Sequence, residues 1–468
     1  MTGKVAGAYE PLSIDEPNSP TPPRTQSSCQ WISDVLALEV LRSLERDAQI
    51  CVLCKMIRMF SFGFLAVMLV IYLVNLNFDM EDIGLMFTLT LLGDAILSIL
   101  LTTHADTWGR RFTLMVGSII AILTSIIFAS SSNFSVLVLA AILGVISPSG
   151  SEVGPFMAIE VSSLSQVCRD EDRTKVLAWY NLFGSCSSAS GALTCGFIMK
   201  VLQSGKAPMS LLQSCRFVMF VYSLLQICQV VAFYQLGPEV EVPKATGPKA
   251  SPVGQFLGLH KSKLIVLKLC ALFLIDSFGG SLVLQSVISN WFHDTYDTNP
   301  ATLGTIVFVC NIVAGVSALF AAKLADQIGL IMTMFVTHLP SNVLLILVPI
   351  MPNESLAIFM ICARYSISQM DVPTRNAYVQ GVVEADERSA ANGVTNVIRS
   401  VGASTGPYLA GFLYTIPKYR NYPFYIAGLL KIIYDCLLLW SMSSTKPAHE
   451  IKQQEEAKLA EMRNGSKV

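Results

Sequence analysis

Long apolar stretches, separated by short polar ones, run through most of this chain. A helix needs about 20 apolar residues to cross the hydrocarbon core of a membrane, and segments of roughly that length recur throughout the sequence. The pattern predicts twelve membrane-spanning helices in two sets of six. The first set is 57–77, 83–103, 112–132, 134–160, 175–203 and 215–236, and the second is 264–291, 301–324, 330–350, 354–380, 389–416 and 422–443.

The polar stretches predict how these segments are organised. Many Pro, Ser and Thr residues predict a disordered N-terminal tail without a signal peptide, and apolar residues at helical spacing then predict an amphipathic helix on the membrane surface. A stretch rich in Pro and Lys predicts a linker between two bundles. The predicted parts are tail 1–33, amphipathic helix 34–55, bundle 56–236, linker 237–262, bundle 263–443 and tail 444–468.

The fifth segment of each set carries the same residues in the same order. Arg173, Asn181, Gly191, Gly196 and Phe197 recur as Arg388, Asn396, Gly406, Gly411 and Phe412. Such a repeat in a strongly apolar chain indicates two similar helical bundles joined in tandem. Two bundles of this kind can rock about a site between them, which is the architecture of a carrier. We expect the repeated glycines to be positions of close helix packing.

Composition and charge exclude several classes of protein. Hydrophobic residues make up 53% of the chain and charged residues 14%, whereas a soluble protein carries about 25% charged residues. The net charge of -1 and the lack of a dense basic run argue against nucleic-acid binding. The sequence shows no phosphate-binding loop, no catalytic Ser/His/Asp cluster and no metal-ligand pattern. We therefore expect neither an enzyme nor an ATP-driven pump, and no cofactor or metal.

Lysine and arginine predict the orientation, because cytoplasmic loops carry an excess of both. One side collects Arg42, Arg46, Lys55, Arg58, Arg110, Arg111, Arg169, Arg173, Lys175, Lys323 and Arg388, together with the lysines of the linker. The other side has only Lys200, Lys206, Arg216, Lys418 and Arg420. Both termini are therefore predicted to be cytoplasmic. The plasma membrane is favoured, with a vacuolar or other organellar membrane as the alternative.

A short loop motif joins the second and third segments. It reads His104-Ala-Asp106-Thr-Trp-Gly109-Arg110-Arg111, and part of it returns between the eighth and ninth segments as Ala325-Asp326-Gln-Ile-Gly329. A loop this short needs the backbone freedom of glycine. The motif resembles the signature loop of the major facilitator superfamily, and the layout of six plus six segments matches that family over nearly the whole chain.

The resemblance implies an all-α membrane protein of twelve helices in two pseudo-symmetric bundles, with a cytoplasmic gate at the loop. In that family the loop's Asp and Arg pair with neighbouring helix ends in one conformation and release them in the other. The gating residues would be Asp106, Gly109, Arg110 and Arg111, with Asp326 and Gly329 in the second half. Thr102 and Thr107 replace an expected Gly and a basic residue, and Leu330 and Ile331 replace arginines. We therefore expect the second latch to be weak.

The resemblance also implies a central site lined by the first, fourth, seventh and tenth helices. The fourth segment holds Glu152 between Pro148 and Pro155, and the tenth holds Asp371 beside Pro373. Broken helices at membrane depth are tolerated only where they are buried in protein or line a wet cavity. The candidate solute- and proton-binding residues are Glu152, Asp371, Asp276, Arg364, Arg375, Arg399, Asn181, Asn396 and Asp94.

Each of these residues also has a structural interpretation. Glu152 and Asp371 would hold helices together if they paired with Arg364, Arg375 or Arg399. Asp94 would either bind a proton or tie two helices. The Asn181 and Asn396 amides, taken as buried, would either bond across helices or touch solute. Lys431 and Asp435, four residues apart in the last segment, are expected to neutralise each other.

The function that follows is secondary active transport of a small organic solute by alternating access. Membrane carboxylates predict coupling to protons, and export by antiport is favoured over uptake by symport. A non-transporting receptor on the same scaffold is a further alternative. The expected partners are a small-molecule solute, protons and the lipid bilayer, with the chain acting as a monomer. The Gly402-Ala-Ser-Thr-Gly406-Pro407 run looks like the Gly-Pro motif of drug antiporters, which lies in their fifth helix, whereas here it is in the eleventh.

Overall fold

The chain folds into helices joined by short turns. The computed structural model describes residues 44–144, 146–147, 156–168, 173–204, 208–241, 259, 261–384, 387–443 and 445. Within these residues the regular structure consists of α-helices and short 3-10 helices, with no strand. The predicted all-α class is confirmed.

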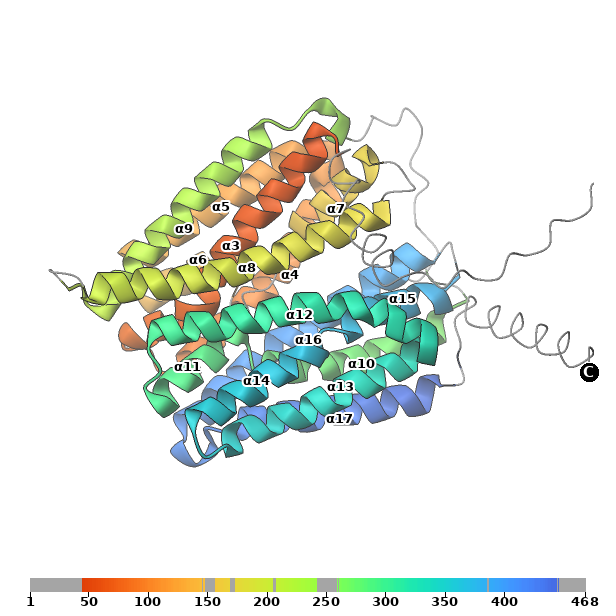
Figure 1. Cartoon of the computed structure of the whole chain (residues 1–468). Helices are drawn as coiled ribbons and strands as arrows, with labels where there is room; N and C mark the ends of the chain where they lie inside the picture. The colour runs from red at the N-terminus through yellow and green to blue at the C-terminus, as the bar shows by residue number, and fades with distance from the viewer. Residues whose placement is uncertain are drawn as a thin grey trace, which may run out of the picture. The chain divides into compact units, whose positions relative to one another are not determined.

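Helices from the two halves of the chain form two groups (Figure 1). The N-terminal half contains α3 (Arg46–Asn75), α4 (Met80–Trp108), α5 (Arg110–Ser130), α6 (Phe134–Leu143), α7 (Phe156–Val167), α8 (Arg173–Ser204), α9 (Leu211–Tyr234) and η1 (Pro238–Val240). The C-terminal half contains α10 (Lys263–Ser281), α11 (Gln285–Tyr296), α12 (Pro300–Ile328), α13 (Leu330–Leu347), η3 (Val348–Ile350), α14 (Glu354–Ser368), α15 (Asp371–Val382), α16 (Arg388–Thr415), η4 (Pro417–Tyr419) and α17 (Tyr422–Met442).

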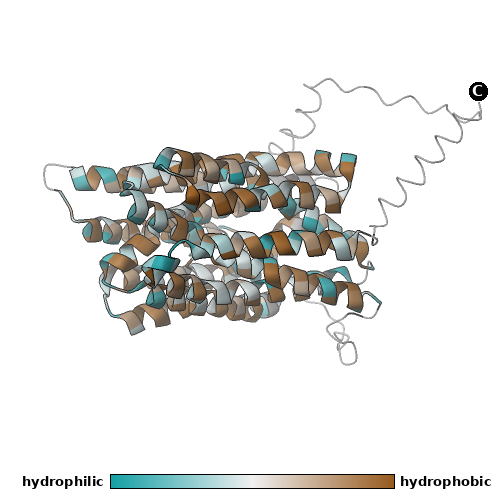
Figure 2. Ribbon diagram, turned by 90° about the horizontal axis from the view of Figure 1, so that it is seen from below, coloured by the Kyte–Doolittle hydropathy of each residue, from teal (hydrophilic) through white to brown (hydrophobic). Residues whose placement is uncertain are grey.

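Nine helical spans among the described residues are long and apolar enough to cross a membrane. The three other predicted segments are the fourth, the tenth and the eleventh. The fourth is divided into α6 and α7, the tenth into α14 and α15, and the eleventh is the single helix α16. The structure is therefore consistent with twelve crossings. Figure 2 shows apolar residues, in brown, along most of the helices. Many large apolar side chains are exposed, among them Leu123, Phe197 and Trp440, which fits contact with lipid.

Two predicted boundaries differ from the structure. Helix α3 begins at Arg46 and continues through residue 55 to Asn75, so no break separates a surface helix from the first span. The rest of the predicted amphipathic helix lies outside the described residues. The seventh predicted segment breaks between α10 and α11, just after Gly279 and Gly280. Two consecutive glycines weaken a helix, but the break itself falls on apolar residues and left no polar signal.

The repeated residues play equivalent parts in the two halves. Helices α8 and α16 both begin at the repeated arginines, Arg173 and Arg388. A Cβ on Gly191 would clash with the backbone of α3, and one on Gly406 would clash with α10. Gly196 meets the start of α12, and Gly411 meets the start of α4. The expected close packing at these glycines is confirmed, and it joins the halves as well as the helices within each half.

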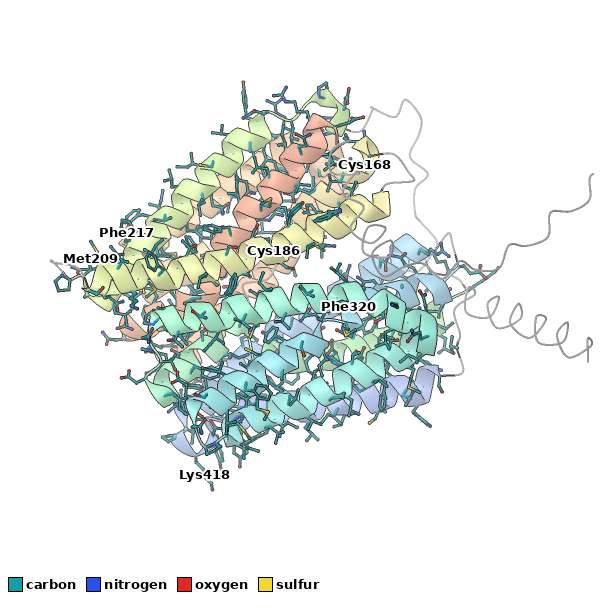
Figure 3. The ribbon with its side chains drawn as sticks, viewed as in Figure 1. Cys168, Cys186, Met209, Phe217, Phe320 and Lys418 are labelled. Atoms are coloured by element: carbon teal, nitrogen blue, oxygen red, sulfur yellow. The ribbon has the colours of Figure 1, made fainter. Side chains whose placement is uncertain are left out.

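The halves approach each other most closely at one end. We call the end that carries Glu241 and Lys261 the linker face, and the opposite end, marked by Met209 and Lys418 in Figure 3, the distal face. Near the distal face, α8 and α12 are in backbone contact at Gly196 and at Gly304. Towards the linker face they separate (Figure 1). The chain thus brings its halves together distally and leaves them apart where the linker joins them.

Candidate functional site

Six ionisable side chains are buried together inside the C-terminal half. This C-half charge cluster consists of Asp276 on α10, His338 on α13, Asp371 and Arg375 on α15, and Lys431 and Asp435 on α17. All six are less than 10% exposed. Buried charges need partners with good geometry, because their desolvation is costly. The cluster therefore ties four helices into one electrostatic unit at the middle of the bundle.

Asp276 stands at the centre of the cluster. Its Oδ1 accepts from Lys431 Nζ at 2.6 Å, and its Oδ2 lies 3.3 Å from Arg375 Nη1. The same Arg375 nitrogen donates to Asp371 Oδ2 at 2.9 Å. Asp371 lies in the first turn of α15, where a negative charge is favoured by the helix dipole. Of the predicted site residues, the structure therefore brings Asp276, Asp371 and Arg375 together.

His338 completes the cluster and was missed in the sequence. Its Nδ1 lies 2.7 Å from Asp435 Oδ1, and its Nε2 lies 3.9 Å from Asp276 Oδ1. Asn342, one turn further along α13, donates to Asp435 Oδ2 at 2.9 Å. The available signal was the polar stripe His338, Ser341 and Asn342 in an otherwise apolar helix, which indicates a face turned into the bundle.

Lys431 and Asp435 do not pair with each other as expected. Lys431 pairs with Asp276 on α10, and Asp435 contacts His338 on α13, so each has its partner on another helix. Gly279 leaves room for the Lys431 stem, because a Cβ there would lie 3.3 Å from Lys431 Cγ. Spacing along one helix could not reveal partners that come from elsewhere in the fold.

Two further predicted arginines border the cluster without joining its ion pairs. Arg399 on α16 is half-buried and is attracted electrostatically by Asp276 and Asp371. Arg364 on α14 is 9% exposed, and its guanidinium lies over the ring of Tyr365 at 5.0 Å. Arg364 lies on the buried stripe of α14 with Ala357, Ile361 and Ser368.

The N-terminal half contains a buried ion pair that the sequence did not reveal. Arg58 on α3 donates to Glu160 on α7 through two nitrogens, at 2.6 and 2.7 Å. The Tyr180 hydroxyl on α8 also donates to Glu160. Arg58 and Glu160 are each fully buried. Both stand near the ends of predicted segments, where the sequence suggested the membrane surface. Their burial shows that these helix ends are packed inside the bundle.

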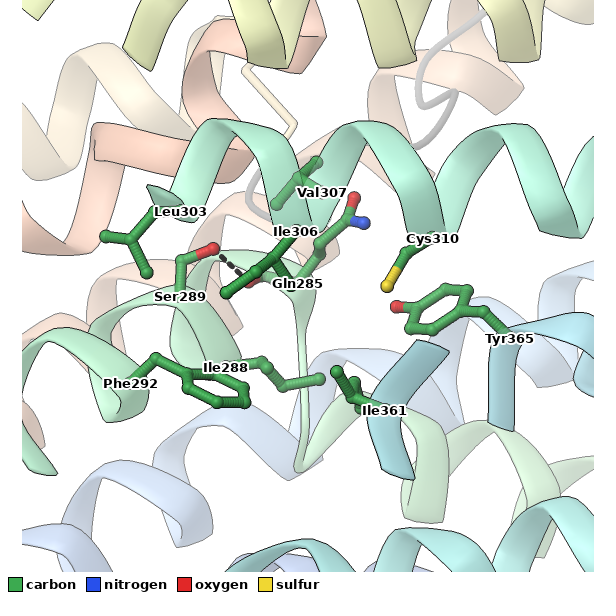
Figure 4. A pocket seen from close by; sticks show the side chains of 10 residues that line it. All are labelled: Gln285, Ile288, Ser289, Phe292, Leu303, Ile306, Val307, Cys310, Ile361 and Tyr365. Atoms are coloured by element: carbon green, nitrogen blue, oxygen red, sulfur yellow. Dashed lines mark hydrogen bonds between the residues drawn. The ribbon is translucent and has the colours of Figure 1, made fainter. Parts of the chain in front are cut away.

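A small cavity lies between α11, α12 and α14 of the C-terminal half (Figure 4). Its volume is about 10 Å³, roughly the space that one water molecule needs. The polar groups on its wall are Gln285, Ser289 and Tyr365. Ser289 donates to the Ala66 carbonyl of α3 at 2.9 Å. Gln285 donates to Asn311, whose amide lies 3.4 Å from Ser188 on α8. Side chains next to the break between α10 and α11 thus reach the other half.

Asn181 and Asn396 are exposed, so the expectation of buried amides is wrong. Asn181 lies on the same face of α8 as Ser188 and Gly196, which approach α12. Asn396 lies on the same face of α16 as Pro407 and Gly411, which approach α4. Helical spacing fixes these faces. The two amides are therefore exposed because they lie along the joining faces but beyond the point where the halves separate.

Two candidate carboxylates have no place in the cluster. Asp94 is half-buried on α4, next to Gly93, which packs against the backbone of α6. Glu152 lies outside the described residues, as does most of the predicted break between α6 and α7.

The gating loop is held by a partner from its own half. Gly109 and Gly329 have φ of 101° and 85°, conformations that favour glycine. The backbone N–H groups of Arg110 and Arg111 donate to the Glu241 carboxylate at 2.7 and 3.1 Å. The side chain of Arg110 donates to Gln166 and to the Val240 carbonyl.

This contact places the start of the predicted linker on the N-terminal half. Helix η1 and Glu241 are fixed to α5 and α7, and the Gly237 N–H donates to Asp47 on α3. In the second half, Asp326 is exposed. The side chain of Asp106 is outside the described set.

Comparisons with known proteins agree with this architecture. The family model of the Major Facilitator Superfamily matches residues 51–369 and, in a second match, residues 269–466. An uncharacterized membrane protein of Saccharomyces cerevisiae, YJR124C, is 28% identical over 84% of this chain and 93% of its own length. The quinolone resistance protein NorA of Staphylococcus aureus is 20% identical over 80% of this chain and 92% of its own.

A solved structure shows the same fold. The crystal structure of a D-xylose-proton symporter superposes with a TM-score of 0.65 at 11% identity, covering 84% of this chain and 96% of that one.

Proposed function

The chain belongs to the Major Facilitator Superfamily, and we propose that it couples the movement of its solute to protons and exports that solute by antiport. It is an integral membrane transporter of a small solute and not an enzyme. The alternative is proton-coupled uptake by the same machinery. The observation that carries the proposal is the C-half charge cluster, a buried set of titratable groups that joins four helices.

The cluster suits proton binding because its charges are closely balanced. Three carboxylates face two fixed cations, Arg375 and Lys431, with Arg399 close by. His338 lies between Asp276 and Asp435 with Asn342 beside it and the Tyr434 ring against its edge. Histidine is the side chain whose charge changes near neutral pH. A proton arriving at His338 or a carboxylate would redistribute the ion pairs between α10, α13, α15 and α17.

The two halves are apart at the linker face and in contact at the distal face. This is the arrangement of a carrier in the state that is open to one side of the membrane. The excess of Lys and Arg near this face supports a cytoplasmic location for it and for both termini. We therefore propose that the described conformation faces inward. Asn181 and Asn396 stand on the separated walls and are proposed to contact the solute. Asp94 and Glu152 remain candidates for solute or proton binding. We expect the protein to act as a monomer in the plasma membrane.

We propose that the gating loop acts as a cytoplasmic latch, as in the family, and that Glu241 is its partner in this conformation. Asp106, Gly109, Arg110 and Arg111 would form the cytoplasmic latch, with Glu241 holding it in this conformation. Asp326 and Gly329 would form the weaker latch of the second half.

Export is favoured because NorA, one of the relatives that match most of the chain in sequence, is named for quinolone resistance. The likeness to the xylose symporter, in contrast, is one of fold. The solute of neither protein is assigned to this chain.

Flux in proteoliposomes tests the proposal. The purified protein is reconstituted with a pH-sensitive dye inside, and labelled solutes of different charge are offered with and without a pH gradient. We expect solute flux to follow the gradient and protons to move with it. Asp276→Asn and His338→Gln should uncouple the two, whereas the exposed variant Glu239→Gln should not. Flux that is independent of the gradient would remove proton coupling. A ligand that binds without crossing would favour the receptor.

A further inference from the structure

We propose that the transported solute is an organic acid, and that Arg364 binds its acidic group. This inference rests on the proposed transport function and adds the chemical class of the solute. It begins with the cations buried among the helices and with the partners that the fold provides for them.

Three buried cations among the described residues have a carboxylate on another helix. Arg58 pairs with Glu160 at 2.6 Å, Arg375 lies 3.3 Å from Asp276, and Lys431 lies 2.6 Å from the same residue. These contacts follow the rule that a charge removed from water is stable only when it is paired and hydrogen-bonded. Any other buried cation of this chain is compared with these three.

Arg364 departs from this rule. It is 9% exposed. Among the described residues its side chain forms no ion pair, and its guanidinium lies over the ring of Tyr365 at 5.0 Å. A charged residue in this position of a membrane protein indicates a ligand pathway. Its missing counter-ion is therefore expected to come from outside the chain.

The surroundings of Arg364 suit the body of an organic acid. Ile361 and Tyr365, which lie close to Arg364 on α14, line the small cavity of Figure 4 together with Cys310. The remaining wall is mainly apolar, from Ile288, Phe292, Leu303, Ile306 and Val307, with the Gln285 amide as a polar group. A guanidinium binds a carboxylate through two parallel hydrogen bonds. The site thus offers an anion clamp beside an apolar wall.

The cavity is too small for a solute in this conformation, so the site must widen during transport. It lies beside the break between α10 and α11 and borders α3 through Ser289. Movement of the two halves would open it, because Ser289 and Asn311 contact α3 and α8 directly. Binding at Arg364 is then linked to the motion that carries the solute.

Thermal stabilisation of the full-length protein by a charge-matched pair of probes tests the assignment. Benzoate and benzamide share size and shape and differ in charge. We expect benzoate to raise the Tm of the wild type and benzamide to leave it unchanged. Arg364→Gln should weaken benzoate binding at least about tenfold. Arg364→Lys, which keeps the charge but loses the planar fork, should bind benzoate with intermediate affinity. Arg216→Gln, which changes an arginine at the distal face, is the matched control.

Several results would overturn the inference. They are equal stabilisation by benzoate and benzamide, an unchanged benzoate affinity in Arg364→Gln, and stabilisation by inorganic phosphate alone. A double variant tests whether Glu152 is the counter-ion instead. If Glu152→Gln restores the Tm that Arg364→Gln has lost, the two residues pair within the chain, and the inference fails.

The flux assay separates this failure from failure of the proposed function. Gradient-driven flux of neutral or cationic solutes alone would leave proton-coupled transport in place and remove the organic acid. The absence of gradient-driven flux for solutes of every class would remove the proposed function.

Discussion

Individual residues show where charge is tolerated inside this membrane protein. In the described part of the chain, the N-terminal half buries the Arg58–Glu160 ion pair and the C-terminal half buries the six-residue cluster. A buried pair adds little net stability compared with apolar residues, yet breaking it leaves an uncompensated charge. The two halves thus share a fold while using buried charge differently, and only the C-terminal set contains a histidine.

Removing one partner of the N-terminal pair should destabilise the protein strongly. In Glu160→Gln the Arg58 guanidinium stays buried with a neutral partner, so we expect a loss of about 3–5 kcal/mol. The double variant Arg58→Met/Glu160→Leu removes both charges and should recover much of this loss. Denaturant unfolding of the purified protein measures both. A double variant that is less stable than Glu160→Gln would contradict this account of the pair.

For individual residues, the sequence showed which charged side chains are buried better than it showed which side chains they pair with. Asp276, Asp371 and Arg375 stood out because they are charges in apolar segments, and the structure places them together. His338 and Glu160 were missed since each looks ordinary in its own segment. Their partners are far away in the sequence, on Asp435 and on Arg58. Such pairings depend on which helix faces meet, and a single sequence does not contain that information.

Helices meet at glycines that the two halves share. Gly196 and Gly411 bring α8 to α12 and α16 to α4 at the distal end. The tandem repeat and these packing positions were predicted from the sequence, as was the break between α14 and α15, which Asp371 and Pro373 signalled. The break between α10 and α11 was not, because Leu282, Val283 and Leu284 continue the apolar pattern.

Adding a methyl group at these glycines should weaken the distal contact. In Gly196→Ala and Gly411→Ala the new Cβ would meet backbone atoms that cannot move independently, at a cost of about 1–3 kcal/mol. We expect the distal ends of the halves to move apart, as measured by spin-label distances across that face. Gly393→Ala is the matched control, since no atom lies within 4 Å of its added Cβ. Unchanged distal distances in both variants would contradict the packing argument.

The start of the linker is a second element whose role depends on one side chain. Glu241 accepts from two backbone N–H groups at the N-terminus of α5, a charge-assisted contact worth about 1.5–3 kcal/mol. Glu241→Gln should loosen η1 and raise hydrogen exchange over residues 236–241. Glu239→Gln changes a neighbouring exposed carboxylate and should have no such effect. Equal exchange in Glu241→Gln and the wild type would show that the carboxylate does not hold the segment.

The whole molecule joins two similar halves that are in contact distally and apart at the linker face. Its interbundle contacts include small residues and single hydrogen bonds, such as Ser188 with Asn311, Thr88 with the Tyr408 N–H, and the Tyr408 hydroxyl with Glu81. Weak contacts of this kind can be exchanged for equivalent ones at the opposite end. The buried charges lie inside each half, so they would move with it as a unit. This arrangement is what alternating access requires.

The direct test of alternating access is a pair of distances measured in the same preparation. Spin labels replace Trp108 and Gln327 at the linker face, and Ser132 and Met351 at the distal face; none of the four is a residue proposed to bind solute or protons or to form a latch. Double electron–electron resonance then follows both distances between pH about 5 and about 8, where histidine titrates. The account predicts that the linker-face distance shortens as the distal distance lengthens. Two distances that stay fixed, or that change in the same direction, would contradict it.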